Sequence, residues 1–380
     1  MKIRWACARL IREEQDLFGK IRRKNHIKKI SRRSFLAVCG AMAATAALTA
    51  CGGSSASTAG TTASGSTAGS AAGSAASGEV FELKLSTTQT DTSMIYQGLQ
   101  AAADKVAEDT DGHVKVTIYP SSQLGGEEDM IDQALQGMGI AVLTDAGRLS
   151  SYVNDIGIMN MAYIVDNYED GMKLMATDTF KGWDADLANN GICGLCYNYY
   201  DGARSFMGHK PYKTPADLKG AVIRTPGADP YVESISAMGA TPYNIAWSEV
   251  YNGIQTKSID GCEVQYTSAV SSKIYEVCEY VSKTEHINLF NMVICGQAWF
   301  DKLPAEYQEV MKKDFNDCAY NNAQDIIAAQ ADMEKTLTDN GMTIVEVDKD
   351  VFREAVKPAY EKLGWTELRE QLYKEAGVEA

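Results

Sequence analysis

Residues 304–340 read PAEYQEVMKKDFNDCAYNNAQDIIAAQADMEKTLTDN, a stretch with no glycine and with its only proline at the first position. Strong helix formers dominate it, and apolar residues recur at helical spacing from Val310 through Phe315 and Ile326 to Met333. Proline is tolerated at the start of a helix, where its missing N–H is not needed. At about 1.5 Å per residue such a helix extends for roughly 55 Å, which exceeds one lobe of about 130 residues. We therefore expect a long helix that crosses between two lobes.

The segments before this helix alternate between strand-like and helix-like patterns. Residues 81–86 and 113–119 alternate apolar and polar residues, as half-buried strands do, whereas residues 96–109 carry apolar residues at helical spacing. Short apolar runs at 140–143 and 191–197 predict further strands. This order of elements favours an α/β architecture.

The N-terminal part carries two short export motifs. Ser31-Arg32-Arg33-Ser34-Phe35-Leu36 resembles a twin-arginine export signal, and Leu48-Thr49-Ala50-Cys51 resembles a bacterial lipobox. The 16 uncharged residues between Phe35 and Ala50 are fewer than the roughly 20 that a membrane-spanning helix needs. We expect residues 1–50 to be a signal peptide and Cys51 to become the lipidated N-terminus of an extracytoplasmic protein anchored to the cell membrane.

Composition separates a tether from an acidic body. Residues 51–78 are almost entirely Gly, Ser, Ala and Thr, too polar and small to form a core, which predicts a flexible tether. Residues 1–50 carry a net charge of +9, and subtracting this from the −14 of the whole chain leaves −23 for the rest. Such a body is a poor nucleic-acid binder. An anionic solute remains compatible with this charge if the site gathers the few positive residues.

Motifs for metal binding and catalysis are sparse in the body. Cys193 and Cys196 form a CxxC pair, but on a strand residues three apart point to opposite faces, so we expect no metal site. The six body cysteines could form one or two disulfides outside the cytoplasm. The body contains no phosphate-binding loop, zincin motif or nucleophile elbow, and the acidic run 127–129 is interpreted as the first turn of a helix. We expect a binding protein without a cofactor rather than an enzyme.

Two arginines are the strongest candidates for a binding site. Arg224 ends the apolar strand 221–224, and Arg204 follows the strand-like run 191–197. Ligands of open α/β sheets bind at the carboxyl ends of strands, where a guanidinium can hold a carboxylate through two N–H groups. The residues alone leave open whether each arginine binds a ligand or pairs with a nearby acid such as Asp201 or Asp229.

Six stretches between residues 112 and 315 resemble the DctP-like solute-binding subunit of TRAP (tripartite ATP-independent periplasmic) transporters. They are VTIYPSSQLGGE (116–127), KTPADLKG (213–220), IRTP (223–226), MGATP (238–242), WSEVY (247–251) and QTKSIDG (255–261). The resemblance implies a two-lobed, periplasmic-binding-protein-like α/β fold with hinge strands and a long helix spanning both lobes. Lobe I would comprise residues 79–201 and 290–329, and lobe II residues 202–289 and 330–380. A bound solute would draw the lobes together.

The same resemblance implies a set of ligand contacts. Arg224 falls where the family anchors the carboxylate of its ligand, and Arg204 would reinforce it. Trp247, where relatives usually have Phe, would form the apolar floor. Asp145 and Arg148 follow strand 140–144 toward the cleft, where Arg148 either is a third cationic contact or pairs with Asp145.

One part of the motif departs from the family. Many relatives carry Gln-Glu-Asn-Pro after the Asp-Gly pair, whereas this chain has Cys262-Glu263-Val264-Gln265. The usual asparagine is thus Val264, and Glu263, Gln265 and Tyr266 are the candidates for polar contacts beside it.

The function expected from this resemblance is capture of a small-molecule organic acid and its delivery to TRAP membrane subunits. A sugar acid is the first expectation, because aromatic and hydroxyl-bearing residues surround the arginines, and a small dicarboxylate is the second. We expect a monomer. A ligand-sensing partner of a signalling receptor is the alternative, since it would share the same binding apparatus.

Overall fold

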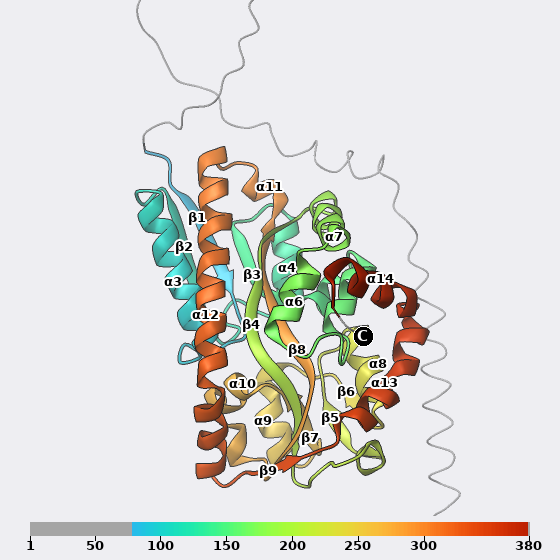
Figure 1. Ribbon diagram of the computed structural model, residues 1–380. Coiled ribbons are helices and arrows are strands. Elements are labelled where there is room, and N and C mark those ends of the chain that lie inside the picture. The colour runs from blue at the N-terminus through green and yellow to red at the C-terminus, as the bar shows by residue number, and fades with distance from the viewer. Residues whose placement is uncertain (1–77, 379–380) are drawn as a thin grey trace, which may run out of the picture. The chain divides into compact units, whose positions relative to one another are not determined.

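The computed structural model describes residues 78–378. The expected signal peptide, Cys51 and nearly all of the tether lie outside this range. Within it, none of the helices combines the length and the apolar character needed to cross a membrane. Helices and strands alternate as predicted (Figure 1).

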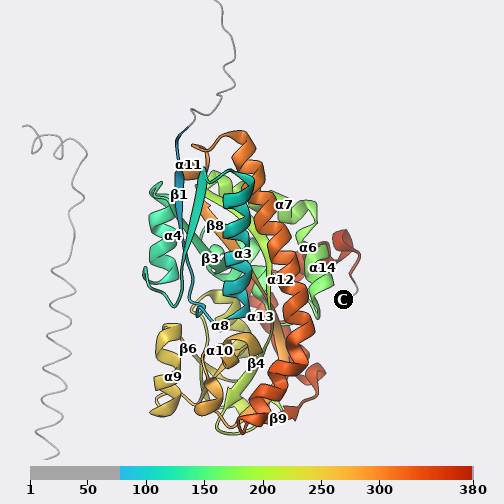
Figure 2. The ribbon, with the colours of Figure 1, turned by 90° about the vertical axis from the view of Figure 1, so that its left-hand side faces the viewer.

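One mixed sheet runs through the protein in the order β2-β1-β3-β8-β4-β7-β5-β6, with β9 beside β8. At one end of this order, parallel strands β1 (Phe81–Ser86), β2 (Val114–Tyr119) and β3 (Ile140–Asp145) are accompanied by α3 (Met94–Asp109) and α4 (Glu127–Leu135). At the other end, β5 (Val222–Arg224), β6 (Thr241–Tyr243) and β7 (Gly261–Val264) are accompanied by α8 (Asp229–Ala237), α9 (Trp247–Gln255) and α10 (Tyr266–Ser271). Figures 1 and 2 show these groups as an upper and a lower lobe.

Two long antiparallel strands, β4 (Ile192–Gly208) and β8 (Tyr280–Gly296), belong to both lobes. The end of β8 pairs with β3, and its beginning pairs with β9 (Thr343–Glu346). The end of β4 pairs with β7. These shared strands confirm the two-lobed fold with hinge strands. The exact lobe boundaries stay a prediction.

The predicted long helix is α12, from Ala305 to Asp339, flanked by Pro304 and Asn340. It packs against α3 and β4, and against α10 near its end, so it runs along both lobes (Figures 1 and 2). The chain then continues through β9 into α13 (Lys349–Leu363) and α14 (Thr366–Ala376). Helix α13 contacts α8, whereas α14 contacts α6 (Tyr168–Met175).

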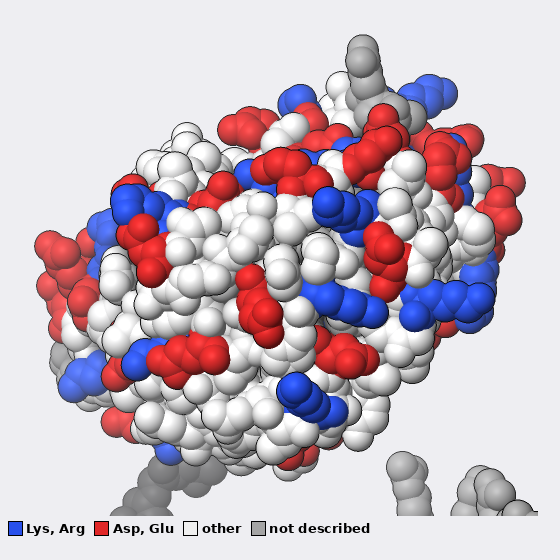
Figure 3. Space-filling view, turned by 90° about the horizontal axis from the view of Figure 1, so that it is seen from below, with Lys and Arg blue, Asp and Glu red and all other residues white. Residues whose placement is uncertain are grey.

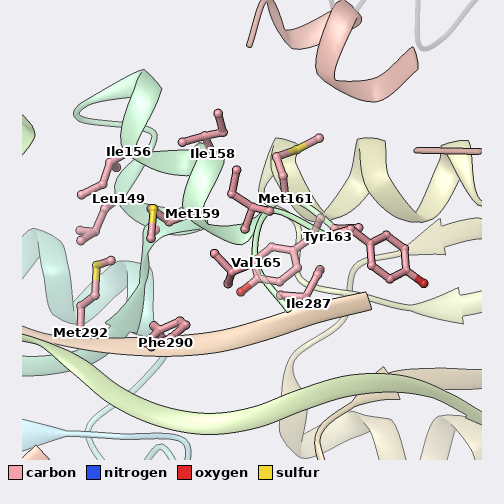
Figure 4. Packing of buried hydrophobic residues seen from close by; sticks show 14 of the residues in the cluster. Leu149, Ile156, Ile158, Met159, Met161, Tyr163, Val165, Ile287, Phe290 and Met292 are labelled. Carbon is pink, nitrogen blue, oxygen red and sulfur yellow. The ribbon is translucent and has the colours of Figure 1, made fainter. Parts of the chain in front are cut away.

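The remaining elements cover the shared strands or connect them. They are α5 (Ala146–Leu149), η1 (Asn154–Asn160), α7 (Asp178–Asn189), η2 (Pro215–Leu218), η3 (Ile274–Glu276) and α11 (Gln297–Phe300). Met159, Met161 and Val165, in and after η1, pack over β8, beside Ile287 and Phe290 (Figure 4). The hinge strands are buried along most of their length, although they carry polar residues as well as apolar ones.

The argument against a CxxC metal site was wrong in one step. Cys193 pairs with Cys295 and Cys196 pairs with Val293, because a register shift lies between Gly194 and Cys196. Residues 293 and 295 share a face of β8, so the β-bulge places Cys193 and Cys196 on one face as well. All six cysteines of the described range are free thiols. Residues 78–378 contain no group of three or more His, Cys, Asp or Glu that could hold a metal ion.

Candidate anion-binding cavity

A cavity of about 470 Å³ opens where the two lobes face each other across the shared strands. Gln89 and Asp145 line it from the lobe of β1–β3, and Arg224 and Trp247 line it from the lobe of β5–β7. Asn291 of β8 contributes from the hinge. Because β1, β3 and β5 all end here, the cavity follows the rule that α/β sheets bind ligands at the carboxyl ends of strands.

Arg224 is a buried cation without a counter-ion among the described residues. It ends β5 and is 5% exposed. Its only side-chain hydrogen bond within residues 78–378 runs from Nε to the carbonyl of Ile245, at 3.2 Å, and its guanidinium carbon lies 5.3 Å from the ring centroid of Trp247. Burial, followed by the positive charge of Arg204, lowers its pKa to about 10. It therefore stays charged at neutral pH and would gain free energy from an anion.

Arg204, in contrast, is already neutralised. Its guanidinium donates from Nε and Nη2 to the carboxylate of Glu263, with Nη2 at 2.7 Å from Oε1, and from Nη1 to Oε1 of Gln265 at 3.0 Å. Thr225 donates to the same carboxylate at 2.7 Å, and Nε2 of His286 lies 3.5 Å from it. Arg204 thus pairs with Glu263, a residue of neighbouring strand β7, and not with Asp201.

The charges on Glu263 and Arg204 stabilise each other. Burial alone would raise the pKa of the Glu263 carboxyl, but the charge and hydrogen bonds of Arg204, together with the nearby His286 ring, lower it to about 2. Glu263 is fully buried and does not line the cavity. It supports Arg204 from behind instead of contacting a solute.

Arg148 also has an acidic partner. Of the two roles considered from the sequence, a third cationic contact or a pair with Asp145, the structure shows the second. It pairs with Asp145, whose side chain also caps α5 by accepting from the backbone N–H of Arg148 at 3.1 Å. Its Nε donates to Oε1 of Glu128 at 3.1 Å. Glu127 Oε2 lies only 2.9 Å from that nitrogen, yet it receives no hydrogen bond among the described residues. Glu127 lines the cavity as a residue, but this oxygen is itself buried against Arg148.

Only part of the stretch that departs from the family motif reaches the cavity. Val264, the last residue of β7, and Gln265 line it. Tyr266, the first residue of α10, does not. Its hydroxyl lies 3.4 Å from Glu334 of α12, and it lines a separate groove behind the hinge. The expected polar replacement for asparagine is therefore Gln265 rather than Tyr266.

Comparison with known proteins agrees with this geometry. Residues 85–365 match the family model described as bacterial extracellular solute-binding protein, family 7. The chain belongs to this family. It is 25% identical over 280 residues to the sialic acid-binding periplasmic protein SiaP of Vibrio cholerae, covering 74% of this chain and 87% of that protein.

Two solved structures extend the comparison. A TRAP periplasmic solute-binding protein from Escherichia fergusonii is 31% identical with a TM-score of 0.70, covering 78% of this chain and all (100%) of that one. Another from Ochrobacterium anthropi, with bound L-fuconate, is 25% identical with a TM-score of 0.76, covering 78% and 99%. This family-7 protein is therefore a TRAP solute-binding subunit, as its motifs predicted.

The sequence patterns do not point to several residues of the family-7 cavity. Gln89 follows β1, so the rule for strand ends could have suggested it. Asn291 and Tyr231 lie inside β8 and α8, where nothing in the pattern marks them. Glu127 does begin α4 as interpreted, but it also reaches the cavity.

Basic and acidic side chains are interspersed on the lower face of the molecule (Figure 3). On the face shown in Figure 3, basic side chains lie beside acidic ones and do not gather into a patch of their own. Many are paired on the surface, as Lys283 is with Glu334 at 2.9 Å. Among the arginines of the cavity, Arg224 alone has no acidic partner within residues 78–378.

Replacing Glu127 with glutamine is expected to remove a pH-dependent part of the stability. Burial raises the pKa of Glu127 to about 7, with the Arg148 charge opposing the shift. A carboxyl whose pKa is raised in the folded state stabilises the protein below its unfolded pKa, and this stabilisation is lost as the pH rises through about 7. The wild type should lose stability relative to Glu127→Gln as the pH rises from about 4.5 to about 7, measured by urea unfolding. Glu128→Gln is the control, since its side chain is 74% exposed. Parallel curves for wild type and Glu127→Gln would contradict the assignment.

Proposed function

We propose that this family-7 protein captures a polyhydroxylated monocarboxylate, a sugar acid, and hands it to the membrane subunits of a TRAP transporter. The observation that carries the proposal is Arg224, a buried guanidinium with no carboxylate partner among residues 78–378, beside the cavity and the Trp247 ring. A solute carboxylate would accept two N–H groups from it.

The other charges favour one carboxylate over two. Arg204 and Arg148 are each paired with acids, so a second solute carboxylate would lie near Glu127 or Asp145 without an unpaired cation. A further negative charge close to these buried carboxylates is unfavourable. Hydroxyl groups, in contrast, could form hydrogen bonds with the uncharged amides of Gln89 and Asn291, which line the cavity. A sugar acid is therefore preferred to a small dicarboxylate.

The ligands of relatives support the same class. The Ochrobacterium anthropi protein was solved with L-fuconate, a sugar acid. In this chain Trp247 offers an aromatic face next to Arg224, which suits the carbon chain or ring of such a solute. Binding would draw the two lobes together about β4 and β8.

A thermal-shift screen tests the proposal, because a ligand that binds only the folded state raises the melting temperature. The panel contains aldonates and uronates, the corresponding neutral sugars, and four-carbon dicarboxylates. We expect at least one sugar acid to raise the midpoint, and its neutral counterpart to leave it unchanged. A dicarboxylate that stabilises more than every sugar acid would refute the proposed class. Mass spectrometry of the recovered ligand should show it chemically unchanged, as expected of a carrier and not of an enzyme.

The delivery step and the lipid anchor are parts of the same proposal. Reconstituted TRAP membrane subunits should take up the solute only when this protein is added, an outcome that the receptor-sensing alternative does not predict. The lipobox ending at Cys51 supports anchoring to the membrane. Metabolic labelling with a fatty acid should mark the wild-type chain and not Cys51→Ser, and equal labelling would exclude this anchor.

A further inference from the structure

Asp201 is turned toward the cavity floor by an irregularity in β4. Its neighbours Tyr200 and Gly202 pair with two consecutive residues of β8, so Asp201 is the extra residue of a β-bulge. Gly202 has a φ of +95°, and a Cβ there would lie 2.8 Å from Nε2 of Gln330. The bulge thus depends on a glycine. It gives a hinge strand one side chain that leaves the regular alternation.

The carboxylate of Asp201 receives hydrogen bonds from both lobes and from the hinge. Nε2 of Gln89 donates to it at 3.0 Å, Nδ2 of Asn291 donates at 3.3 Å, and the Nε2 of Gln265 and the hydroxyl of Thr267 donate at short range. Asp201 is 0% exposed, so it does not touch the solute itself. Three of its partners, Gln89, Gln265 and Asn291, are amides that line the cavity.

An ionised carboxylate only accepts hydrogen bonds, so each amide must turn its NH2 group toward Asp201. Gln265 has no freedom left, since its Oε1 accepts from Arg204 at 3.0 Å and its Nε2 also donates to Ser268 at 2.9 Å. The side-chain oxygens of Gln89 and Asn291 make no hydrogen bond within residues 78–378, and neither is sealed from the surface. These two oxygens remain for the solute.

We propose that Asp201 is the positioning residue of the cavity floor: it orients the amides of Gln89 and Asn291 so that their oxygens accept hydrogen bonds from solute hydroxyl groups. This inference rests on the proposed function and divides recognition of the solute between two parts of the cavity. Arg224 recognises the carboxylate of any acid, whereas the amides held by Asp201 recognise the hydroxylated chain. An asparagine at position 201 would present its own NH2 group to several donors, so at least one amide would have to turn over.

Binding measurements on Asp201→Asn with two probes test this division. The probes are the six-carbon aldonate that binds the wild type best and hexanoate, which has the same chain length without hydroxyl groups. The wild type should strongly prefer the aldonate. In Asp201→Asn this preference should fall by about tenfold or more, since at least one amide oxygen that accepts from the solute is replaced by an N–H group, while hexanoate affinity stays within about twofold. An unchanged preference, or an equal loss for both probes, would overturn the assignment of Asp201.

Further variants separate the possible failures. Gln89→Leu and Asn291→Leu each remove one of the amides that would accept from the solute and leave Asp201 in place. They therefore test the proposal even if Asp201→Asn does not fold. Each should lower the preference, and adding Asp201→Asn to Gln89→Leu should cost less than the two changes made separately. Asp166→Asn is the control, because its side chain is 57% exposed and pairs with Arg353 behind the hinge. A wild type that binds hexanoate as well as the aldonate would instead refute the proposed function, and this inference with it.

Discussion

Replacing Arg224 with alanine is expected to lower the affinity for the solute by about a hundredfold or more. Truncating one partner of a buried, hydrogen-bonded charge pair costs about 2–5 kcal/mol, and each 1.4 kcal/mol is about a tenfold change in the dissociation constant. Isothermal titration with the best sugar acid of the panel measures this loss. The unliganded variant should be at least as stable as the wild type, because Arg224 is buried without a counter-ion among the described residues and its pKa is lowered by that burial.

The combination of lost binding and preserved stability is what distinguishes an anchor from a structural arginine. Arg353→Ala is the matched control: this arginine pairs with Asp166 at 2.6 Å, away from the cavity, and its removal should leave affinity unchanged. Arg224→Lys should bind with intermediate strength, since an ammonium keeps the charge but not the two parallel N–H groups. Wild-type affinity in Arg224→Ala would remove the carboxylate anchor from the proposed function.

Replacing Glu263 with glutamine is expected to lower the free energy of unfolding by about 3 kcal/mol or more, because it leaves the buried Arg204 cation without its partner. The loss should depend on pH. Glu263 has its pKa lowered from 4.5 to about 2, so its stabilisation is present above the unfolded value and disappears as the pH falls through the folded one. Urea unfolding at neutral pH and in acid measures both effects.

Two comparisons show whether the effect belongs to the buried pair. Arg204→Met combined with Glu263→Leu should recover much of the lost stability, because apolar replacements of a buried ion pair are often neutral. Asp339→Asn breaks an exposed pair with Lys335 on α12, whose side chains are 61% and 68% exposed, and should change little. If Glu263→Gln is as stable as the wild type, the pairing with Arg204 does not contribute to the free energy of unfolding as expected.

The helices and strands that were expected from local patterns are present, most of them with small shifts at their ends. The long helix was expected from residue 304 to 340 and runs from Ala305 to Asp339, because a stretch of good helix formers bounded by proline needs little tertiary information. Strand 191–197 was expected to be short, whereas β4 extends to Gly208. The polar residues of its second half belong to the hinge and the cavity floor. There the strand is stabilised by buried hydrogen-bonding partners, and its sequence does not show the alternation of apolar and polar residues.

The role of each arginine was less predictable. Arg204 and Arg224 looked equivalent, both near strand ends and both near acids. Their environments differ because β7, which carries Glu263, lies between β4 and β5 in the sheet. Glu263 turns toward Arg204 and leaves Arg224 unpaired among residues 78–378. Arg148 likewise pairs with Asp145 and the start of α4, and Tyr266 faces away from the cavity.

The order of residues is enough to recognise features that depend on neighbours within a few positions. These features are the export motifs, the acidic body, the alternating strands and helices, the long helix and the cationic strand end. Residues far apart in the chain, such as Gln89, Asp201 and Asn291, decide the details of the cavity. They determine which cation is unpaired, which carboxylate is buried and which amide faces the solute. Sheet order and one β-bulge bring these groups within hydrogen-bonding distance, and at that distance pairing and loss of water set their charges and orientations.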